Sequence, residues 1–376
     1  MDDEGEPRER PRGSKARPKS DENGAAAWAR DIGVAVLAVI IVIGSIFAYS
    51  SAWPPMVVIE SGSMMHSHER SMLGVIDTGD LTLVKKVGQR SDIITYLDAA
   101  NQSHSNAGHQ TYGNYGDVII YARNGHFELI PIIHRAITWL QFNRSYAPFS
   151  GGAPPSVLNS TWDLPDLGRY NITVPANTNT HQVQSLGMVR SWHFGSEQLV
   201  EISIDLTSAA MIMGTHPHSG FITKGDNNAG PDEAAVPPAR NLQGPPPAWD
   251  PHGTTDVQPV MFEWVVGRAE FELPWFGVLK LWFGGNAGPI PANSQTNLLL
   301  AIIVIAAGPF VVEQVWMRYG DRVTSRIPQK TKDRWHGAWD KLPGGKRRAE
   351  RRRERAEELE EERRKRGGRR QGGRAR

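Results

Sequence analysis

The chain of 376 residues contains no cysteine. This absence excludes disulfide bonds, a thiolate metal site and a cysteine nucleophile. It leaves the compartment open, because proteins outside the cytoplasm need not carry disulfide bonds. The length is sufficient for one large domain, or two modest ones, with a sizeable core.

Two stretches of the chain lack charge. Residues 33–48 hold no charged side chain, their apolar character extends to Trp53, and residues 298–312 form a second such run. Because about 20 apolar residues span a bilayer as a helix, we expect transmembrane helices at 30–52 and 298–316. The alternative for the first run is a cleaved signal peptide. However, the run is longer than the usual signal core and follows a long charged tail.

Charge is distributed unevenly between the middle and the end of the chain. Residues 53–297 carry 13 Lys and Arg against 21 Asp and Glu, whereas residues 317–376 carry 22 against 10. The Lys and Arg excess directly after the second apolar run predicts that this side faces the cytoplasm. Two spans then place both termini in the cytoplasm, and residues 54–296 form the extracytoplasmic domain of a multi-pass cell-membrane protein.

The two ends of the chain are polar. Residues 1–27 have few apolar side chains, which predicts a disordered cytoplasmic tail. The basic tail, 317–376, contains no aromatic residue after Trp339. We therefore expect no nucleic-acid partner and favour anionic membrane lipids, or a ribosome docked at the membrane, as partners of this tail. The alternative is that its charge only retains the tail in the cytoplasm.

Short apolar stretches alternate with turn residues between the two apolar runs, for example at 81–86 and 118–122. This pattern predicts a mainly β domain. Residues 143–200, rich in Pro, Gly, Ser, Asn and Thr, are interpreted as an insertion that binds a partner, shields the site or decorates the surface. The aromatic run 273–283 predicts either a segment in the lipid headgroup region or an ordinary buried helix.

Two serines at the end of a β-favouring run are candidate catalytic residues. Ser61 and Ser63 follow residues 57–59, and alternate residues of an extended chain share one face. A serine is a useful nucleophile when a neighbouring base removes its proton, and a second hydroxyl or a backbone N–H can stabilise the oxyanion. Ser-Gly-Ser is also an ordinary turn sequence, so the pattern alone leaves both interpretations open.

A histidine and two aspartates could complete such a site. His134 lies in the apolar run 130–137, and a histidine changes its charge near neutral pH, as a general base must. A carboxylate is needed to orient this base, and Asp226 or Asp232 could supply it. The alternatives are a hydrogen-bonded core histidine and two ordinary turn or helix-capping aspartates.

The 12 histidines give no sign of a metal site. None shows the His-x-x-x-His spacing that puts two ligands on one helix face, and the pairs at 66/68 and 216/218 fall in loop-like sequence. We therefore expect neither zinc nor another cofactor.

Four stretches occur together in an order typical of one enzyme family. They are ESGSM at 60–64, DTGDLTLVK at 77–85, HR at 134–135, and KGDNN at 224–228 followed by Asp232. With the apolar runs around them, these stretches resemble signal peptidase I of the archaeal and endoplasmic-reticulum type. Members of this family are membrane-bound serine endopeptidases.

The resemblance implies a fold, an activity and a role for each candidate residue. It implies a signal-peptidase-type β catalytic domain that removes signal peptides from secretory preproteins after a small-residue motif. Ser63 corresponds to the nucleophile, His134 to the general base and Asp232 to the carboxylate that orients it. Asp226 corresponds to a second important aspartate, and Ser61 to a serine that assists the oxyanion hole. The implied partners are secretory preproteins, membrane lipids and the protein-translocation channel.

Two features qualify this resemblance. The bacterial branch carries a lysine immediately before the arginine of the third motif, where this chain has His134, which favours the Ser-His-Asp branch. Residues 65–70, MHSHER, differ from the Pro or acidic residue usual after Ser-Met, and we expect them to form one lip of the substrate groove. Two alternatives remain: a same-mechanism protease for a special surface-protein substrate, and a catalytically inactive membrane-anchored binding protein.

Overall fold

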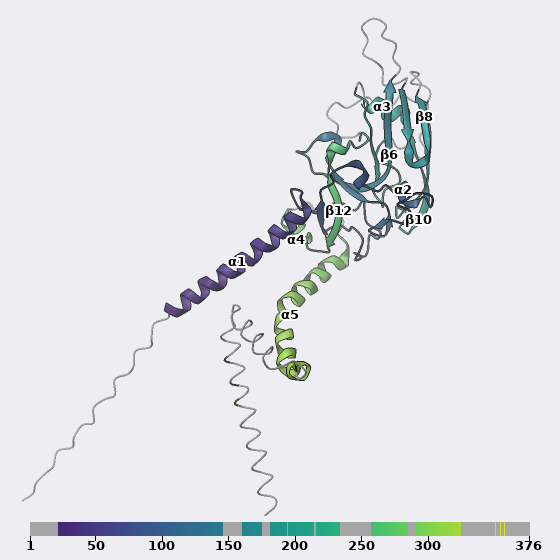
Figure 1. The fold of residues 1–376 in the computed structure, drawn as a ribbon. Coiled ribbons are helices and arrows are strands. Elements are labelled where there is room, and N and C mark those ends of the chain that lie inside the picture. Colours follow the sequence, from purple (N-terminus) through teal and green to yellow (C-terminus); the bar gives the residue numbers. More distant parts are fainter. Residues whose placement is uncertain are drawn as a thin grey trace, which may run out of the picture. The chain divides into compact units, whose positions relative to one another are not determined.

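A computed structural model describes the greater part of the chain (Figure 1). The described residues are 22–145, 160–174, 181–193, 195–213, 216–233, 257–284 and 290–324, together with Glu350, Glu354 and Glu357. The chain divides into two units, of which one is Ser45–Val311 and the other comprises Met1–Gly44 and Val312–Arg376. All strands lie in the unit Ser45–Val311 as far as the chain is described.

An antiparallel sheet of eight strands forms the centre of the unit Ser45–Val311. Seven strands follow the order β1-β2-β12-β5-β6-β7-β8, and β11 pairs with β6. The eight strands are β1 (Met56–Val58), β2 (Leu81–Lys85), β5 (Val118–Tyr121), β6 (Ile132–Ser145), β7 (Ser160–Leu164), β8 (Arg169–Val174), β11 (Gly220–Lys224) and β12 (Val265–Leu273). The expectation of a mainly β, sheet-rich domain is confirmed at this level.

Smaller elements surround this sheet. Two further antiparallel pairs are β3 (Gln110–Thr111) with β4 (Asn114–Tyr115), and β9 (Val183–Ser191) with β10 (Gln198–Asp205). The short helices are α2 (Tyr96–Ala100), α3 (Leu206–Met213), α4 (Val278–Gly284), and the 3-10 turns η1 (Arg90–Asp92), η2 (Arg123–Gly125), η3 (Pro165–Leu167) and η4 (Phe262–Trp264).

The long strand β6 joins the two halves of the sheet (Figure 1). Residues 132–135 of this strand pair with β5, residues 135–140 with β11 and residues 141–145 with β7. His134 lies near the start of this strand, directly opposite Ile119 of β5. Residues that face each other across an antiparallel pair share one face of the sheet. The histidine therefore lies on the face that carries Ile119 and Tyr121.

Alternation along β5 separates two apolar clusters. Val118 and Ile120 pack with Ile59 and Met64 of the chain after β1, whereas Ile119 and Tyr121 pack in a different cluster with β6 and β11. All four β5 side chains are buried, because successive residues of a strand point to opposite, covered faces of the sheet. The candidate residues on β6 and after β1 are thus anchored by apolar packing on both sides.

Residues 143–200, interpreted above as an insertion, contain ordered structure. They supply the end of β6, then β7, η3, β8 and β9, and the first residues of β10. Trp162 and Leu186 are buried there and pack with Ile202, Ile204 and Leu206 of the following segment. Residues 146–159, 175–180 and 194 lie outside the described residues, as do the prolines between 237 and 247.

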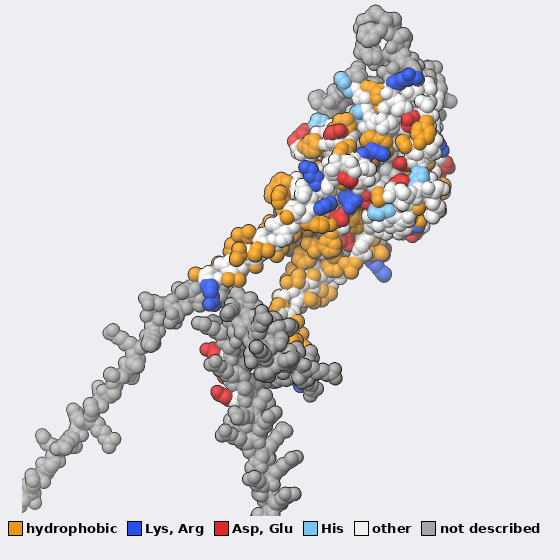
Figure 2. Space-filling view, in the orientation of Figure 1, with side chains coloured by type: hydrophobic (Ala, Val, Ile, Leu, Met, Phe, Trp, Pro, Cys, Tyr) orange, Lys and Arg blue, Asp and Glu red, His pale blue; other side chains and the backbone are white. Residues whose placement is uncertain are grey.

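Two helices are long and apolar enough to cross a membrane. They are α1 (Glu22–Ser50) and α5 (Ala292–Thr324), whose candidate spans are Trp28–Ser50 and Ala292–Tyr319. Their apolar side chains are largely exposed, and Figure 2 shows these side chains along both helices. Within the described side chains of each candidate span, exposed apolar residues follow one another directly, as at 39–43 and 302–305, so they surround the helix rather than form the single stripe of an amphipathic surface helix.

The boundaries of these helices differ from the expected ones. Helix α1 begins at Glu22 rather than at 30, inside the segment 1–27 that was expected to be a disordered tail. Ala25, Ala26 and Ala27 favour the helical conformation, which explains the earlier start. Helix α5 extends beyond 298–316 at both ends. Residues 1–21, and nearly all of the basic tail after Thr324, lie outside the described residues.

Helix α4, at the end of the run 273–283, has one buried and one exposed side. Val278 and Leu281 are buried, whereas Trp282 and Phe283 are exposed, Phe283 to 91%. The helix lies close to the start of β2, because a Cβ added at Gly277 would be 2.7 Å from the carbonyl oxygen of Asp80. One side of this segment therefore packs on the domain while aromatic side chains project from the other.

Candidate active site

The loop that carries Ser63 is fixed at both ends. Before it, the N–H of Ile59 donates to the carbonyl of Asp80, and the N–H of Gly79 donates to the carbonyl of Ile59. After it, the consecutive residues Met64 and Met65 are both buried, with exposures of 1% and 0%. Ser63 itself is half-buried, so its hydroxyl is held by the protein yet open to a reactant.

The structure brings Ser63 and His134 together. Nε2 of His134 lies 2.8 Å from Oγ of Ser63, although the two residues are 71 positions apart in the chain. The other ring nitrogen, Nδ1, is hydrogen-bonded to Oδ2 of Asp232. With Nδ1–H donating to the carboxylate, Nε2 presents a lone pair and accepts the proton of the Ser63 hydroxyl. This order of bonds is the arrangement that general-base activation of a serine requires.

Asp232 is held by donors other than the histidine. The hydroxyl of Thr223 lies 2.8 Å from Oδ2, and Nδ2 of Asn228 donates to Oδ1 over 3.3 Å. The hydroxyl oxygen of Tyr121 also lies 3.4 Å from this Oδ2, but it is closer, at 2.8 Å, to the Thr223 hydroxyl. A carboxylate that accepts several hydrogen bonds is stabilised in its charged form and cannot rotate freely. Asp232 is therefore positioned to orient His134.

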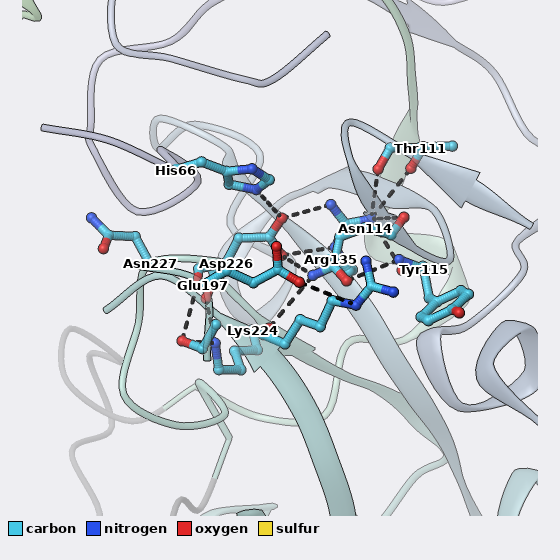
Figure 3. Close-up of polar contacts among 12 residues, drawn as sticks. His66, Thr111, Asn114, Tyr115, Arg135, Glu197, Lys224, Asp226 and Asn227 are labelled. Carbon is cyan, nitrogen blue, oxygen red and sulfur yellow. Dashed lines mark hydrogen bonds and ion pairs between the residues drawn. The ribbon is translucent and has the colours of Figure 1, made fainter. Parts of the chain in front are cut away.

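Asp226 lies in the same turn but has a different partner. Its two carboxylate oxygens accept hydrogen bonds of 2.7 Å each from Nε and Nη2 of Arg135, the residue after His134 (Figure 3). Burial would raise the pKa of Asp226, but the Arg135 guanidinium, with a further bond from His66, holds that pKa well below its usual range. Asp226 contacts neither Ser63 nor His134 in these bonds, so its role is to position the turn.

The turn held by Asp226 clamps the backbone of the serine loop. The N–H of Asn227 donates to the carbonyl of Ser63 over 2.8 Å, and its side-chain Nδ2 donates to the carbonyl of Gly62 over 2.9 Å. This contact explains the asparagine after Asp226, a residue to which sequence reasoning assigned no role. Asn227 belongs to the motif at 224–228, but its contact with the serine loop becomes visible only in the folded structure.

His66 provides a second link between the serine loop and Asp226. Nε2 of His66 lies 3.0 Å from Oδ2 of Asp226, and its ring stacks on Trp192 with centroids 3.4 Å apart and planes at 4°. Figure 3 shows His66 pointing toward Asp226. Residues 65–70 were expected to line the substrate groove, but this side chain is turned inward as a support.

Part of the segment 143–200 contributes to this support. The N–H of Trp192 donates to the carbonyl of Asp226 over 2.9 Å, and the hydroxyl of Ser191 is 3.1 Å from the same oxygen. The end of β9 therefore packs directly against the turn that carries both aspartates. Of the three roles considered for this segment, none anticipated such a contact.

Ser61 lies where it could assist an oxyanion. Its Oγ is 3.2 Å from Oγ of Ser63, and its side chain is exposed. A hydroxyl at this distance from a nucleophile can donate to the oxygen of a bound carbonyl when charge develops there. Over the described part of the chain, no group of three or more His, Asp or Glu side chains could hold a metal ion.

All five predicted site residues are thus placed. Ser63, His134 and Asp232 form a hydrogen-bonded chain, Ser61 adjoins the serine, and Asp226 supports the turn from behind. Comparison with known proteins adds no relative to this geometry: no family model matches the chain, and neither a curated protein nor a solved structure matches it significantly.

Proposed function

We propose that the chain is a membrane-bound serine endopeptidase of the signal-peptidase type that removes signal peptides from secretory preproteins. The observation that carries the proposal is the hydrogen-bonded order Ser63, His134, Asp232. A buried histidine in the core would need only one acceptor, whereas here both ring nitrogens are engaged, one by a serine and one by a carboxylate. This arrangement also argues against an inactive binding protein.

In the proposed reaction, Oγ of Ser63 attacks the scissile carbonyl while Nε2 of His134 takes the hydroxyl proton. The Ser61 hydroxyl and the backbone N–H of Ser63 would stabilise the oxyanion. Collapse of the intermediate breaks the peptide C–N bond, and His134 gives its proton to the leaving amine. A water molecule, activated by the same histidine, then hydrolyses the acyl-enzyme and restores Ser63.

The substrate would bind as an added strand. Strand β1 lies at the end of the sheet order, and among the described residues it pairs with β2 alone, so its other edge can pair with an extended peptide. The serine loop follows directly after β1, and a peptide paired there would present a carbonyl to Ser63. We retain the small-residue preference of the family as part of the proposal.

The apolar helices support a membrane location for this reaction. We propose that α1 and α5 span the cell membrane, with the β domain outside and both termini in the cytoplasm. The support is their length, their exposed apolar side chains and the basic charge after Met317. Anchoring would confine the enzyme to the surface where the apolar segment of a preprotein emerges from the translocation channel.

The test is cleavage of a preprotein by the full chain in membranes. We expect Ser63→Ala, His134→Ala and Asp232→Asn to lower the rate by about a thousandfold or more, because these groups act as one unit. Ser103→Ala, which changes an exposed serine outside the site, is the matched control. Unchanged cleavage by Ser63→Ala would refute the proposal. Cleavage of one surface protein but not of general preproteins would favour the special-substrate alternative.

A further inference from the structure

A second carboxylate, Glu233, lies behind the proposed catalytic chain. Its Oε1 is 2.7 Å from the hydroxyl oxygen of Thr223, and its Oε2 accepts a hydrogen bond of 2.7 Å from the Thr223 N–H. Thr223 in turn lies 2.8 Å from Oδ2 of Asp232. Both Glu233 and Thr223 have 0% exposure, so water does not solvate this contact.

The Thr223 hydroxyl has a single proton, and this limits how many of the neighbouring carboxylates can be ionised. Its oxygen is within 2.8 Å of three others, in Asp232, Glu233 and Tyr121, yet a hydroxyl has one proton to donate and two lone pairs to accept with. Were both carboxylates ionised, the proton could serve only one. The other would face the threonine oxygen at short range without a hydrogen between them, an unfavourable contact at a buried site.

A proton on Glu233 resolves this conflict. The acid then donates from Oε1 to Thr223, Thr223 donates to Asp232, and Asp232 accepts from His134. Tyr121 donates to the remaining lone pair of Thr223, so every polar atom in the cluster has a partner. The reverse placement, with the proton on Asp232, would remove the acceptor of His134 and put the negative charge on the less solvated carboxylate.

The surroundings of Glu233 agree with this assignment. No cation among the residues that the structure describes forms an ion pair with it. Burial, and the charge of Asp232, raise the pKa of Glu233 well above its usual range. Burial and Asp232 likewise raise the pKa of Tyr121, which keeps its hydroxyl a donor.

We propose that Glu233 is an uncharged hydrogen-bond donor that acts through Thr223 to fix Asp232 toward His134. It is a positioning residue, and this role rests on the peptidase function proposed above. A second ionised carboxylate beside Asp232 would repel it and favour rotation away from the ring. A neutral donor instead holds Oδ2 in place when His134 becomes positively charged during the reaction.

Cleavage kinetics of matched variants test the positioning role. Glu233→Gln keeps a neutral side chain that can donate through its NH2 group and accept through its oxygen, whereas Glu233→Leu removes both functions. Thr223→Ser and Thr223→Val form a second such pair. We expect the Leu and Val variants to lose about 10- to 100-fold in kcat with little change in KM, because Asp232 is misplaced rather than the substrate. The Gln and Ser variants should recover most of that loss. A loss in Glu233→Gln as large as in Glu233→Leu would overturn the proposal.

A measurement independent of cleavage tests the neutral state itself. It uses the full chain in detergent micelles, made inactive by Ser63→Ala, with and without Glu233→Gln. A carboxyl whose folded-state pKa is raised stabilises the fold below its unfolded value of about 4.3, and this contribution is lost as pH rises. The Tm of the Gln variant relative to its parent should therefore increase between about pH 5 and pH 9.

The other titratable groups around Glu233 are the same in the Ser63→Ala parent and in its Glu233→Gln variant, so their titration cancels in the Tm difference. Asp232 is its chain neighbour, and the charge of Glu233 acts on Tyr121 of β5. Lys224 follows Thr223 on β11 and interacts with Asp232, and His134 is linked to Glu233 through Asp232. A Tm difference that stays flat with pH would overturn the neutral assignment. If Ser63→Ala cleaved normally, the peptidase function and the orienting role would both fail, while the Tm series would still decide the protonation of Glu233.

Discussion

A Cβ atom added at Gly225 would lie 2.6 Å from the carbonyl oxygen of Ser63. No real Cβ approaches an oxygen so closely, so the residue that precedes Asp226 must be glycine for the turn to reach the serine loop. The same close approach allows the Asn227 N–H to bond that carbonyl. The absence of a side chain at one position thus determines the distance between the two halves of the candidate site.

Under the proposed function, Gly225→Ala should therefore impair cleavage more than folding. The turn must move away from Ser63, which lengthens the contact between His134 and the serine, and a displacement of this kind can lower kcat by about 100-fold. The measurement is kcat on a preprotein together with Tm in detergent. Gly284→Ala is the control, because a Cβ there meets open space. Equal activity of the two variants would show that the turn is free to adjust.

The resemblance assigned Asp232 to His134, but the residues alone did not predict this pairing, and nothing in the sequence predicted the bonds of Asp226 to Arg135. His134 and Arg135 are adjacent, and Asp226 and Asp232 share one turn, so the pattern allowed either pairing. Neighbouring residues of a strand point to opposite faces, and the register of β6 against β5 and β11 determines which face receives the serine. Register depends on contacts that are distant in sequence, and a single chain does not display them.

The supporting residues could not be predicted for a related reason. Tyr121 and Thr223 occur in strands where burial alone explains an apolar or β-branched residue. Trp192 comes from a segment with no place in the resemblance, and its use depends on β9 packing against the aspartate turn. Each of these side chains acquires a role only through a tertiary contact.

The buried pair Arg135–Asp226 should contribute strongly to stability. Arg135 is fully buried, bonds both carboxylate oxygens, and also donates from Nη1 to backbone carbonyls, including that of Gly116 at 2.9 Å. Lysine keeps the charge but not the planar fork. We expect Arg135→Lys to lower the free energy of unfolding by about 3–5 kcal/mol, measured by thermal unfolding in detergent.

An exposed ion pair offers the matched comparison. Nζ of Lys280 lies 2.7 Å from Oε1 of Glu60, but the lysine side chain is 61% exposed. Lys280→Ala should change the free energy of unfolding by no more than about 1 kcal/mol, because water screens the pair. If both variants lost a similar unfolding free energy, the buried bonds between Arg135 and Asp226 would not stabilise the fold more than an exposed ion pair does.

Glu272 should make the domain less stable at high pH. Burial, reinforced by Asp80 and Asp77, raises the pKa of Glu272 to about 8, and its Oε2 has no hydrogen-bond partner within the described residues. Because the folded-state pKa is raised, the stabilising contribution is present below about pH 4.3 and is lost as pH rises through about 8. Burial raises the pKa of Asp77 to about 7, so this group acts in the same direction.

The prediction concerns the difference between the wild type and Glu272→Gln, which cannot ionise. The Tm of Glu272→Gln relative to that of the wild type should increase from pH 5 to pH 9. The increase should be about 2–4 °C for each 1 kcal/mol of unfolding free energy that the wild type loses. Glu263→Gln, at an exposed position, should show no such trend. A Tm difference for Glu272→Gln that is independent of pH would mean that this carboxyl is ionised in the fold throughout.

Lys224 is the alternative to His134 as the general base of the proposed reaction. The lysine is buried, and burial lowers its pKa to about 8, which would suit a base. However, Nζ bonds to Oγ of Ser191 at 3.1 Å and to the carbonyl of Gly225 at 2.9 Å, whereas Ser63 bonds to His134. A base must reach the proton that it removes, so geometry favours the histidine over the lysine.

Under the proposed function, Lys224→Met should therefore keep most of its cleavage activity. Methionine fills a similar volume without the charge, and leaving the Gly225 carbonyl unpaired costs about 1–3 kcal/mol, which should appear as a lower Tm. We expect kcat to stay within about tenfold of the wild type, while His134→Ala falls to background. Tm in detergent separates misfolding from lost chemistry. A folded Lys224→Met as inactive as Ser63→Ala would assign the base to Lys224, and the bond between His134 and Ser63 would then be structural.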